Sequence, residues 1–344
     1  MRILSIGTFK AHNRNNTCSH RSDCLKKHAT EKFTEIDSTI NYNIWTKIIN
    51  KLSYYGIKFY LPDNTNINQK IIDEIKKEKY DIVWIDKGNT IYPKTLSMIK
   101  EMQPQCIIVH YMIDDFMNPY HASKQIIKDI PLYDYYIVNR KKNIEELKER
   151  GCKNPIFTYM SYESKFHFPR TLSKEDRIKL NSDVSFIGTY EKDRAESILY
   201  LAKRGVKVRI WGNGWKKLKN KNPNLIIENH GLYNEDFCKA IKCTKINLAF
   251  LRKKSRDLHT TRSFEIPACG GFMLAERTEE HQDLYVEDKE AVFFSTNEEL
   301  FEKCIFYLSH NEERNKITTA GYQRCINSSY SNEKTIANIL KIII

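Results

Sequence analysis

The stretch Asp257–Gly271 brings charged and hydroxyl side chains together at helical spacing. Arg262 and Glu265 are three residues apart, and Thr261 and Glu265 are four apart, so a helix would carry all three on one face. That face would lie near a helix N-terminus, where backbone N–H groups attract anions. The carboxylate could accept hydrogen bonds from a ribose diol while the N-terminus faces a diphosphate, which is the chemistry of a nucleotide site. An Arg–Glu pair beside a loop, with no ligand, would give the same pattern.

A short helix, from about Arg262 to Cys269, is expected to hold these side chains. Thr260 or Thr261 can cap it by accepting a hydrogen bond from one of its free N–H groups. Gly270 would end it, because glycine adopts the left-handed conformation with little strain.

Apolar runs of strand length alternate with helical patterns along the chain, which predicts parallel sheets with helices on both faces. The expected strands are 2–6, 58–61, 81–85, 106–110, 135–138, 183–187, 206–211, 225–228, 246–250, 272–275 and 291–294. The expected helices are 19–28, 41–55, 68–79, 93–103, 120–129, 141–150, 191–204, 234–242, 262–269, 297–309, 311–327 and 331–343. Residues 160–182 break this alternation, so we interpret them as the connection between two doubly wound domains.

Composition sets the broad class of the protein. A length of 344 residues suggests two domains, and 41% hydrophobic with 12% aromatic residues indicates a globular chain. No apolar run approaches the roughly 18 to 20 residues of a membrane span, and the opening apolar segment is too short for a signal peptide. The nine cysteines form no Cys-x-x-Cys pair, so reduced thiols in a cytoplasmic protein are expected. The net charge of +13 permits an anionic partner, although a general abundance of Lys, Asn and Ile would also produce it.

The block RSFEIPACGGFMLAER at 262–277 also resembles a known family. With DLHT at 257–260 before it and EERNKITTAGYQR at 312–324 after it, it resembles the C-terminal half of the CgeB-like (spore-maturation-type) glycosyltransferases, which are GT-B transferases. The similarity extends upstream, through Ile3–Thr8, Asp86–Gly88, Phe186–Thr189 and Trp211–Trp215, and so covers nearly the whole chain. The FEIPACGG part is specific, whereas the glycine-bearing turns count only in their shared order.

The resemblance implies the GT-B architecture, an α/β fold with two doubly wound, Rossmann-like domains facing each other across a cleft. Residues 1–160 would form the N-terminal, acceptor-binding domain. Residues 183–330 would form the C-terminal, nucleotide-sugar-binding domain, and 331–344 a helix that crosses back to the first domain.

On the donor side, the resemblance gives roles to individual residues. Lys192 and Arg194 are the cations available for the donor diphosphate, His259 would contact a phosphate or the leaving group, and the turn at Gly212 would flank the nucleobase. Surface charges at a helix start and a tight turn would explain the same residues without a ligand. The expected donor residues are Gly188, Lys192, Arg194, Gly212, Arg252, His259, Thr260, Arg262, Glu265 and Gly270.

On the acceptor side, the residues expected at the site are Gly7, Thr8, Asp86 and Lys87. Two residues are candidates for the catalytic base. His20 can titrate near physiological pH, and Asp114 follows an apolar strand, although a surface histidine and a helix cap are the simpler explanations. The neighbouring Asp114 and Asp115 could bind a divalent ion, but GT-B enzymes generally use none. We therefore expect no metal, and no cofactor beyond a UDP- or GDP-linked nucleotide-sugar as co-substrate.

The function expected from these patterns is transfer of a sugar from a nucleotide-sugar to a hydroxyl acceptor. A surface polysaccharide, spore-coat or protein glycan is the first choice of acceptor, in a cytoplasmic enzyme that could touch a membrane peripherally. The alternative is a modified base in DNA, suggested by the +13 charge and the basic runs Arg140–Lys142 and Lys216–Lys221. A second alternative is a GT-B-like protein that binds a partner without catalysis.

Overall fold

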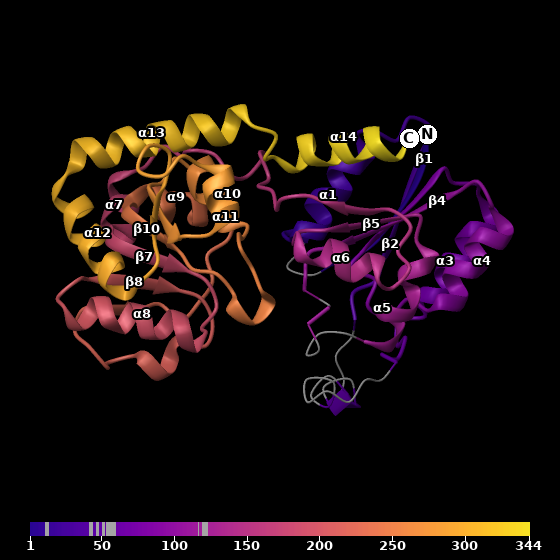
Figure 1. Cartoon of the computed structure of the whole chain (residues 1–344), viewed down its shortest axis with the longest axis horizontal. Coiled ribbons are helices and arrows are strands. Elements are labelled where there is room, and N and C mark those ends of the chain that lie inside the picture. Colours follow the sequence, from indigo (N-terminus) through magenta and orange to yellow (C-terminus); the bar gives the residue numbers. More distant parts are fainter. Residues whose placement is uncertain are drawn as a thin grey trace. The chain divides into compact units, whose positions relative to one another are not determined.

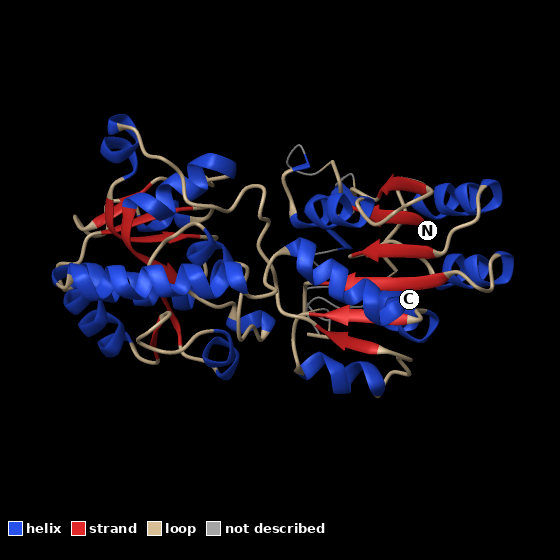
Figure 2. Cartoon of the chain, turned by 90° about the horizontal axis from the view of Figure 1, so that it is seen from above, coloured by secondary structure: helices blue, strands red, loops and turns tan. Residues whose placement is uncertain are grey.

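The computed structural model describes residues 1–10, 14–40, 44–45, 48–49, 52, 60–115, 117–118 and 123–344. It divides into an amino-terminal unit, Met1–Tyr159 with Asn332–Ile344, and a carboxyl-terminal unit, Met160–Ser331. Each unit is built on a parallel sheet of six strands, and helices cover the faces of both sheets (Figures 1 and 2).

The sheet of the amino-terminal unit has the strand order β2-β1-β3-β4-β5-β6. Its strands are β1 (Arg2–Gly7), β2 (Lys32–Asp37), β3 (Ile82–Asp86), β4 (Ile107–Met112), β5 (Tyr135–Val138) and β6 (Pro155–Phe157). Its helices are α1 (Thr17–Lys26), α3 (Ile67–Lys77), α4 (Pro93–Met102), α5 (Lys124–Asp129), η2 (Ile130–Leu132), α6 (Lys142–Lys148) and α14 (Asn332–Ile343). Every residue of β3 is buried, as expected for a central parallel strand covered on both faces.

Helix α14 belongs to the amino-terminal unit although it ends the chain. Its buried residues Ile336, Ile339, Leu340 and Ile343 follow helical spacing and join the core formed by α1 and the strands beside it (Figure 1). Lys27 at the end of α1 forms an ion pair with Glu333 of α14 at 2.9 Å.

The sheet of the carboxyl-terminal unit has the order β12-β11-β10-β7-β8-β9. Its strands are β7 (Ser182–Ile187), β8 (Val208–Trp211), β9 (Leu225–Ile227), β10 (Thr244–Ala249), β11 (Met273–Glu276) and β12 (Val292–Phe294). Its helices are α7 (Lys174–Leu180), α8 (Lys192–Lys203), η3 (Trp215–Leu218), α9 (Asn234–Cys243), η4 (Lys253–Ser255), α10 (Arg262–Ala268), α11 (Glu279–Leu284), α12 (Asn297–Ser309) and α13 (Asn311–Asn327). The direction of strand progression reverses between β7 and β10 here, and between β1 and β3 in the other sheet, and ligands of such sheets bind at these positions.

The α/β fold with two doubly wound parallel sheets is confirmed, and the errors in its elements have local causes. The strand expected at 58–61 is wrong where the structure describes it, since Tyr60 and Leu61 lie in no strand. The edge strand is β2, which is only half-buried and mixes charged with apolar residues, so it lacks an apolar run. The short elements β6, α7 and α11 were not predicted, and α7 lies inside the expected connection 160–182. Most of the helix expected at 41–55 and the start of that at 120–129 lie outside the described residues.

Candidate functional site

Arg262 lies at the carboxyl end of β7, where the carboxyl-terminal sheet reverses direction. Its Nε donates to the carbonyl oxygen of Ile187 at 3.0 Å, its Nη1 pairs with Oε2 of Glu265, and its guanidinium lies 4.5 Å from the centre of the Phe237 ring. The expected pairing of Arg262 with Glu265 on one helical face is therefore confirmed. Three different elements hold this one guanidinium in place.

Glu265 is a buried carboxylate that remains ionised. Burial opposes its ionisation, but Arg262, His167 and the Thr261 hydroxyl hold the pKa of Glu265 below its usual range. Nε2 of His167 lies 3.8 Å from Oε1 of Glu265, and Nδ1 of His167 accepts from the backbone N–H of Glu163 at 3.1 Å. The neutral imidazole therefore carries its proton on Nε2, directed toward the carboxylate. Burial lowers the pKa of His167.

Thr260 caps the turn that leads into α10. Its Oγ1 accepts from the N–H of Arg262 at 3.2 Å, while Oγ of Ser263 accepts from the N–H of Thr260 at 3.0 Å. Thr261 has helical dihedral angles and makes no cap with its side chain. The expected short helix is confirmed, and it ends one residue earlier, at Ala268.

Gly270 lies at the opposite end of α10 from Arg262. It has a φ of +69° and its N–H donates to the carbonyl of Pro267 at 2.8 Å, which ends the helix as expected. Its carbonyl accepts from Lys242 at 3.4 Å. The structure thus gives Gly270 a role in ending α10 and does not place it with Arg262 and Glu265.

Gly188 and Gly212 bring two turns at the carboxyl edge of the sheet into direct contact. A Cβ on Gly212, whose φ is +143°, would lie 2.0 Å from the carbonyl oxygen of Gly188. The same carbonyl accepts from Nε1 of Trp215 at 2.8 Å. Only glycine permits this approach at position 212. The packing of the two turns therefore explains the glycine at this position whether or not a ligand binds beside it.

The geometry of Arg194 does not fit the expected contact with the donor diphosphate, so this expectation is corrected. Its side chain is buried, and it donates to the carbonyls of Leu251, Thr189 and Phe250 at 3.2, 3.1 and 3.3 Å. These bonds tie together the loops after β7 and β10 and leave the guanidinium committed to backbone. Lys192 differs, because its side chain is 84% exposed and pairs only loosely with Glu196, at 3.8 Å. Arg252, which is 47% exposed, pairs with Glu191 at 3.1 Å.

The expected role of His259 at the donor phosphates is also corrected. It is 1% exposed, its Nδ1 donates to Oε2 of Glu280 at 2.5 Å, and its Nε2 accepts from the N–H of Met160 at 2.9 Å. Both ring nitrogens are therefore occupied by the protein, and the expected contact with a phosphate does not fit this geometry.

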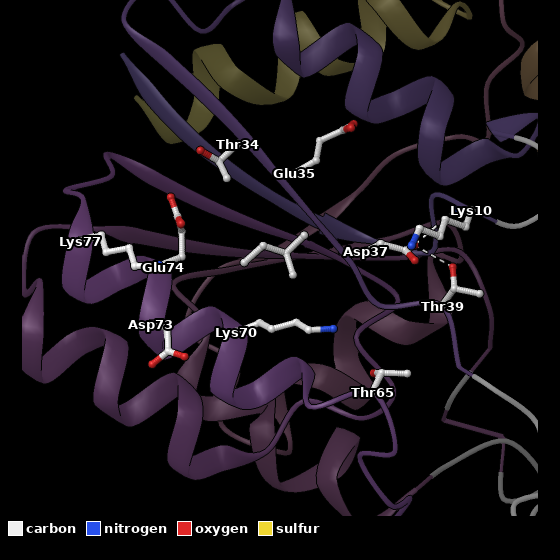
Figure 3. A pocket seen from close by; sticks show the side chains of 11 residues that line it. Lys10, Thr34, Glu35, Asp37, Thr39, Thr65, Lys70, Asp73, Glu74 and Lys77 are labelled. Carbon is white, nitrogen blue, oxygen red and sulfur yellow. Dashed lines mark hydrogen bonds between the residues drawn. The ribbon is translucent and has the colours of Figure 1, made fainter.

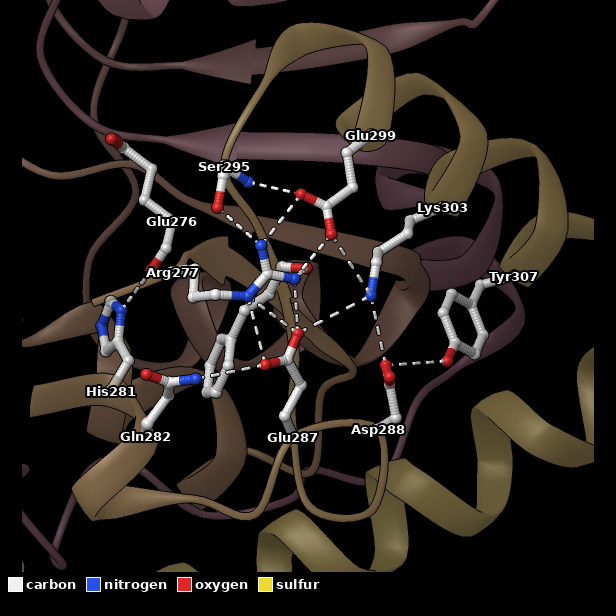
Figure 4. A network of polar contacts seen from close by, with 11 residues as sticks. Glu276, Arg277, His281, Gln282, Glu287, Asp288, Ser295, Glu299, Lys303 and Tyr307 are labelled. Carbon is white, nitrogen blue, oxygen red and sulfur yellow. Dashed lines mark hydrogen bonds and ion pairs between the residues drawn. The ribbon is translucent and has the colours of Figure 1, made fainter. Parts of the chain in front are cut away.

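Arg277, the last residue of the recognised block, lies in a network of ion pairs (Figure 4). Its Nη2 contacts Glu287 at 2.6 Å and Glu299 at 2.5 Å, and Lys303 lies 3.3 Å from Asp288. This network links the end of β11 to α12 and to the loop after α11, so it accounts for Arg277 as a structural residue.

In the amino-terminal unit, Asp86 lies at the reversal between β1 and β3. It binds Nε and Nη2 of Arg21 at 2.6 and 2.8 Å and accepts from the Cys18 thiol at 3.0 Å, and Cys18 in turn accepts from the Thr8 hydroxyl at 3.3 Å. Burial raises the pKa of Cys18 to about 11, so the thiol keeps its proton. A Cβ on Gly7 would lie 3.3 Å from Cβ of Asp86. Gly7, Thr8 and Asp86 therefore do come together, but the Asp86 carboxylate is committed to Arg21.

Lys87 and Asp114 form the accessible part of this region. Nζ of Lys87 lies 3.2 Å from Oδ2 of Asp114, whose side chain is 52% exposed. Burial opposes the charge on Lys87, but Asp114 and the other acidic groups nearby keep its pKa raised. Lys87 has a φ of +68°, and its carbonyl accepts from Nε2 of the buried His110 at 3.0 Å. His20, the other expected base, is buried on α1.

A polar cavity of about 810 Å³ lies between β2 and α3 (Figure 3). It is lined by Lys10, Thr34, Glu35, Ile36, Asp37, Thr39, Thr65, Lys70, Asp73, Glu74 and Lys77. Asp37 accepts from the N–H of Lys10 at 3.2 Å and from the Thr39 hydroxyl at 2.7 Å. Lys10 follows Thr8 in the chain, so the cavity begins close to the expected acceptor residues.

Neither a cluster of metal ligands nor a membrane-spanning helix lies within the described residues. Among these residues, no three His, Cys, Asp or Glu side chains gather as ligands of one metal ion would. No helix within the same ranges is long and apolar enough to cross a membrane.

Several residues of these regions carried no usable signal in the sequence. His167 lies in the expected connection, Phe237 is one apolar residue of an amphipathic helix, and Arg21 is separated from Asp86 by 65 positions. The spacing of Cys18 and Arg21, one helical turn apart, was the one available hint that they share a face.

Part of the chain matches a family of known proteins. Residues 194–341 match a family described as glycosyl transferase-like. A search of curated protein sequences found no significant match.

Solved structures with the same fold cover nearly the whole chain. HepE of Anabaena, in complex with UDP and glucose, has a TM-score of 0.64 and 12% identity over 99% of this chain and 100% of that one. Sucrose-phosphate synthase of Thermosynechococcus elongatus has a TM-score of 0.65 and 11% identity over 99% and 98% of the two chains. A glycosyltransferase of Rickettsia africae has a TM-score of 0.64 and 13% identity over 99% and 97%. The chain therefore has the fold of the GT-B glycosyltransferases, and its carboxyl-terminal part matches a glycosyl transferase-like family.

Proposed function

We propose that this chain is a CgeB-like glycosyltransferase that transfers a sugar from a UDP- or GDP-linked donor to a hydroxyl acceptor. The observation that carries the proposal is Glu265, a buried, ionised carboxylate paired with Arg262 at the reversal of the carboxyl-terminal sheet. It lies inside the segment that matches the glycosyl transferase-like family. The complex of HepE with UDP and glucose supports a nucleotide-sugar as donor for this fold.

The donor site has a simple division of labour in this proposal. Glu265 accepts hydrogen bonds from the ribose diol, using the oxygen that lies nearer His167. Arg262, whose side chain is 28% exposed, faces the diphosphate and stabilises the charge that develops on it as the sugar leaves. Lys192 and Arg252 add positive charge at the rim. No metal ion is required for this chemistry.

For the base that takes the acceptor's proton, Asp114 and His20 are both retained. Asp114 is half-exposed and held by Lys87, so an acceptor hydroxyl can reach it, whereas His20 is buried. Loss of a general base lowers the rate by about 10²–10⁴-fold. We therefore expect Asp114→Asn or His20→Gln to lower turnover by this amount while nucleotide affinity stays unchanged. If both variants keep the wild-type rate, the base lies elsewhere.

The test of the proposal uses the full chain and a panel of UDP- and GDP-linked sugars. Release of nucleotide is followed with and without a chelator, and UDP and GDP binding is measured by calorimetry. Binding of one nucleotide together with turnover that survives the chelator supports the proposal. Absence of binding to either nucleotide would overturn it, and binding without turnover on any acceptor would favour the non-catalytic alternative.

We keep a surface polysaccharide, spore-coat or protein glycan as the acceptor class of a cytoplasmic enzyme. The DNA alternative depends on two basic runs, and one of them is weaker than its sequence suggests because Arg140 is buried and donates to the carbonyl of Ile113. The other run contains Lys217, which lies 3.6 Å from the centre of the Tyr190 ring.

Salt dependence tests the DNA alternative. If these lysines contact phosphates, duplex binding falls steeply with ionic strength, and replacing Lys216, Lys217 and Lys219 by Ala flattens the slope. A dissociation constant weaker than roughly 0.1 mM at physiological salt would leave DNA without support as the acceptor.

A further inference from the structure

Two consecutive residues of α11, Glu280 and His281, hold the turn before α10 from both sides. Glu280 binds His259, which precedes the turn, and His281 binds Ser263, which follows it. All four side chains are at most 1% exposed. The turn between them carries Thr260, Thr261 and Arg262.

The hydrogen bonds of His281 have only one consistent direction. Its Nδ1 lies 2.6 Å from the carbonyl oxygen of Glu276, which can only accept, so Nδ1 carries the proton. Burial lowers the pKa of His281 to about 4, so the ring is neutral at pH 7 and Nε2 accepts from the Ser263 hydroxyl at 2.7 Å. Oγ of Ser263 then accepts from the N–H of Thr260 at 3.0 Å. The chain of bonds runs from the end of β11 to the first residue of the turn.

The second chain of bonds is also fixed in direction. The N–H of Met160 donates to Nε2 of His259, so the proton of that ring is on Nδ1 and is donated to Oε2 of Glu280. The other oxygen of Glu280, Oε1, is buried and has no hydrogen-bond partner within the described residues. A half-satisfied buried carboxylate weakens a fold compared with an apolar side chain of similar size. Stability alone therefore does not explain why an acidic residue occupies position 280.

We infer that Glu280 and His281 are positioning residues that fix the turn at Thr260–Arg262 so that Arg262 and Glu265 are presented to the donor nucleotide. This inference depends on the proposed function, because it gives these buried groups their purpose through the donor site. Neither side chain can reach a ligand itself, since both are enclosed by protein. Their effect passes through the two flanking residues, His259 and Ser263.

The experiment measures affinity for UDP or GDP, whichever the wild type binds, together with the thermal unfolding temperature. Ser263→Ala removes the hydroxyl that links His281 to Thr260. Ser185→Ala is the matched control, because Ser185 is equally buried in the same unit and its hydroxyl also has a side-chain partner, Asn247 at 3.3 Å. We expect Ser263→Ala to weaken nucleotide binding by about 3- to 10-fold, the effect of one neutral hydrogen bond. The control should stay within about twofold.

Glu280 is tested by comparing two replacements. Glu280→Gln keeps an oxygen that accepts from His259 and should retain nucleotide affinity within about twofold, whereas Glu280→Ala should lose about 3- to 10-fold. If Ser263→Ala and Ser185→Ala lower the unfolding temperature equally and bind nucleotide equally, the inference is overturned. If Glu280→Ala does not fold, the serine pair still decides. A wild-type chain that binds neither nucleotide overturns the proposed function, and the inference with it.

Discussion

Each unit places an arginine–carboxylate pair where its sheet reverses direction. The two pairs differ in how completely they are buried and in how many protein groups bind the carboxylate. In the amino-terminal unit, both oxygens of Asp86 bind Arg21, one also accepts from Cys18, and the two charged side chains are 5% and 2% exposed. In the carboxyl-terminal unit, one oxygen of Glu265 binds Arg262, and the Thr261 hydroxyl also lies beside this carboxylate. Nε2 of His167 lies 3.8 Å from the other oxygen, beyond hydrogen-bond distance. Arg262 is also the more exposed arginine, at 28%.

The difference separates a structural pair from one that can take a ligand. Asp86 already accepts three hydrogen bonds from protein groups and its side chain is only 2% exposed, so a substrate cannot reach it. Its pair with Arg21 joins α1 to β3 and shapes the surface around Lys87. Glu265 retains acceptor capacity on an oxygen directed toward a titratable histidine. The same two functional groups, a guanidinium and a carboxylate, therefore serve stability in one unit and, in our proposal, binding in the other.

Removing Asp86 from its buried pair with Arg21 should have the largest effect of these variants on the free energy of unfolding. Asp86→Ala leaves the Arg21 guanidinium buried without its partner, and loss of one member of a buried ion pair destabilises a protein by about 3–5 kcal/mol. Chemical denaturation should show this loss of unfolding free energy. Glu333→Ala is the control, since its pair with Lys27 is exposed and should contribute less than about 1 kcal/mol. Equal effects of the two variants would show that the Arg21–Asp86 pair is not structural.

Acid should weaken both units, because each contains a buried neutral histidine. Burial lowers the pKa of His110 and of His281 to about 4. In the unfolded chain, histidine takes up its proton as the pH falls below about 6.5, whereas the folded chain does so only near pH 4. The unfolded state therefore binds more protons in this window, and the free energy of unfolding should fall as the pH is lowered from 6.5 to 4.

The variant His281→Asn makes this prediction specific. It removes one of the two histidines and should make the decline of unfolding temperature with falling pH shallower than in the wild type. An unchanged slope would mean that folding does not lower the pKa of His281.

Removing Glu265 from its pair with Arg262 should affect nucleotide binding more than stability. A hydrogen bond to a charged group contributes about 1.5–3 kcal/mol, so Glu265→Ala should weaken nucleotide binding by roughly 10- to 100-fold. A 2′,3′-dideoxy nucleotide should bind wild type poorly and lose little more in the variant, because the contact is already absent. If Glu265→Ala lowers the unfolding temperature but keeps wild-type discrimination between the two nucleotides, Glu265 is a structural partner of Arg262, as Asp86 is of Arg21.

The contrast between the pairs also marks how far the sequence could be used. Periodicity predicted the long helices closely, since α12 and α13 have the expected bounds 297–309 and 311–327. It failed at β2, where an edge strand needs no continuous apolar run. The Arg262–Glu265 pair was predictable because its members lie one helical turn apart.

Contacts between residues that are far apart in the chain could not be predicted from the sequence. Arg21 and Asp86, or His259 and Glu280, meet only after the sheets have formed. For the same reason the sequence could not distinguish Arg194 from Lys192. Both are cations at the start of α8, and only the folded loops supply the three carbonyls that occupy Arg194.

The smallest expected effect separates these two cations. Lys192 is 84% exposed, so its attraction to a diphosphate acts through water, where a pair of charges at 4 Å is worth about 1 kcal/mol. Lys192→Ala should therefore weaken nucleotide binding by at most about fivefold at low ionic strength, and the difference from wild type should vanish near 0.5 M salt, where surface charges are screened. Arg194→Lys should instead lower the unfolding temperature, because an ammonium group cannot reproduce three directed N–H bonds to separate carbonyls. The opposite result would be a Lys192→Ala variant with a lower unfolding temperature and an Arg194→Lys variant changed only in the salt dependence of binding. It would show that Lys192 is the structural cation and Arg194 the one that binds the donor.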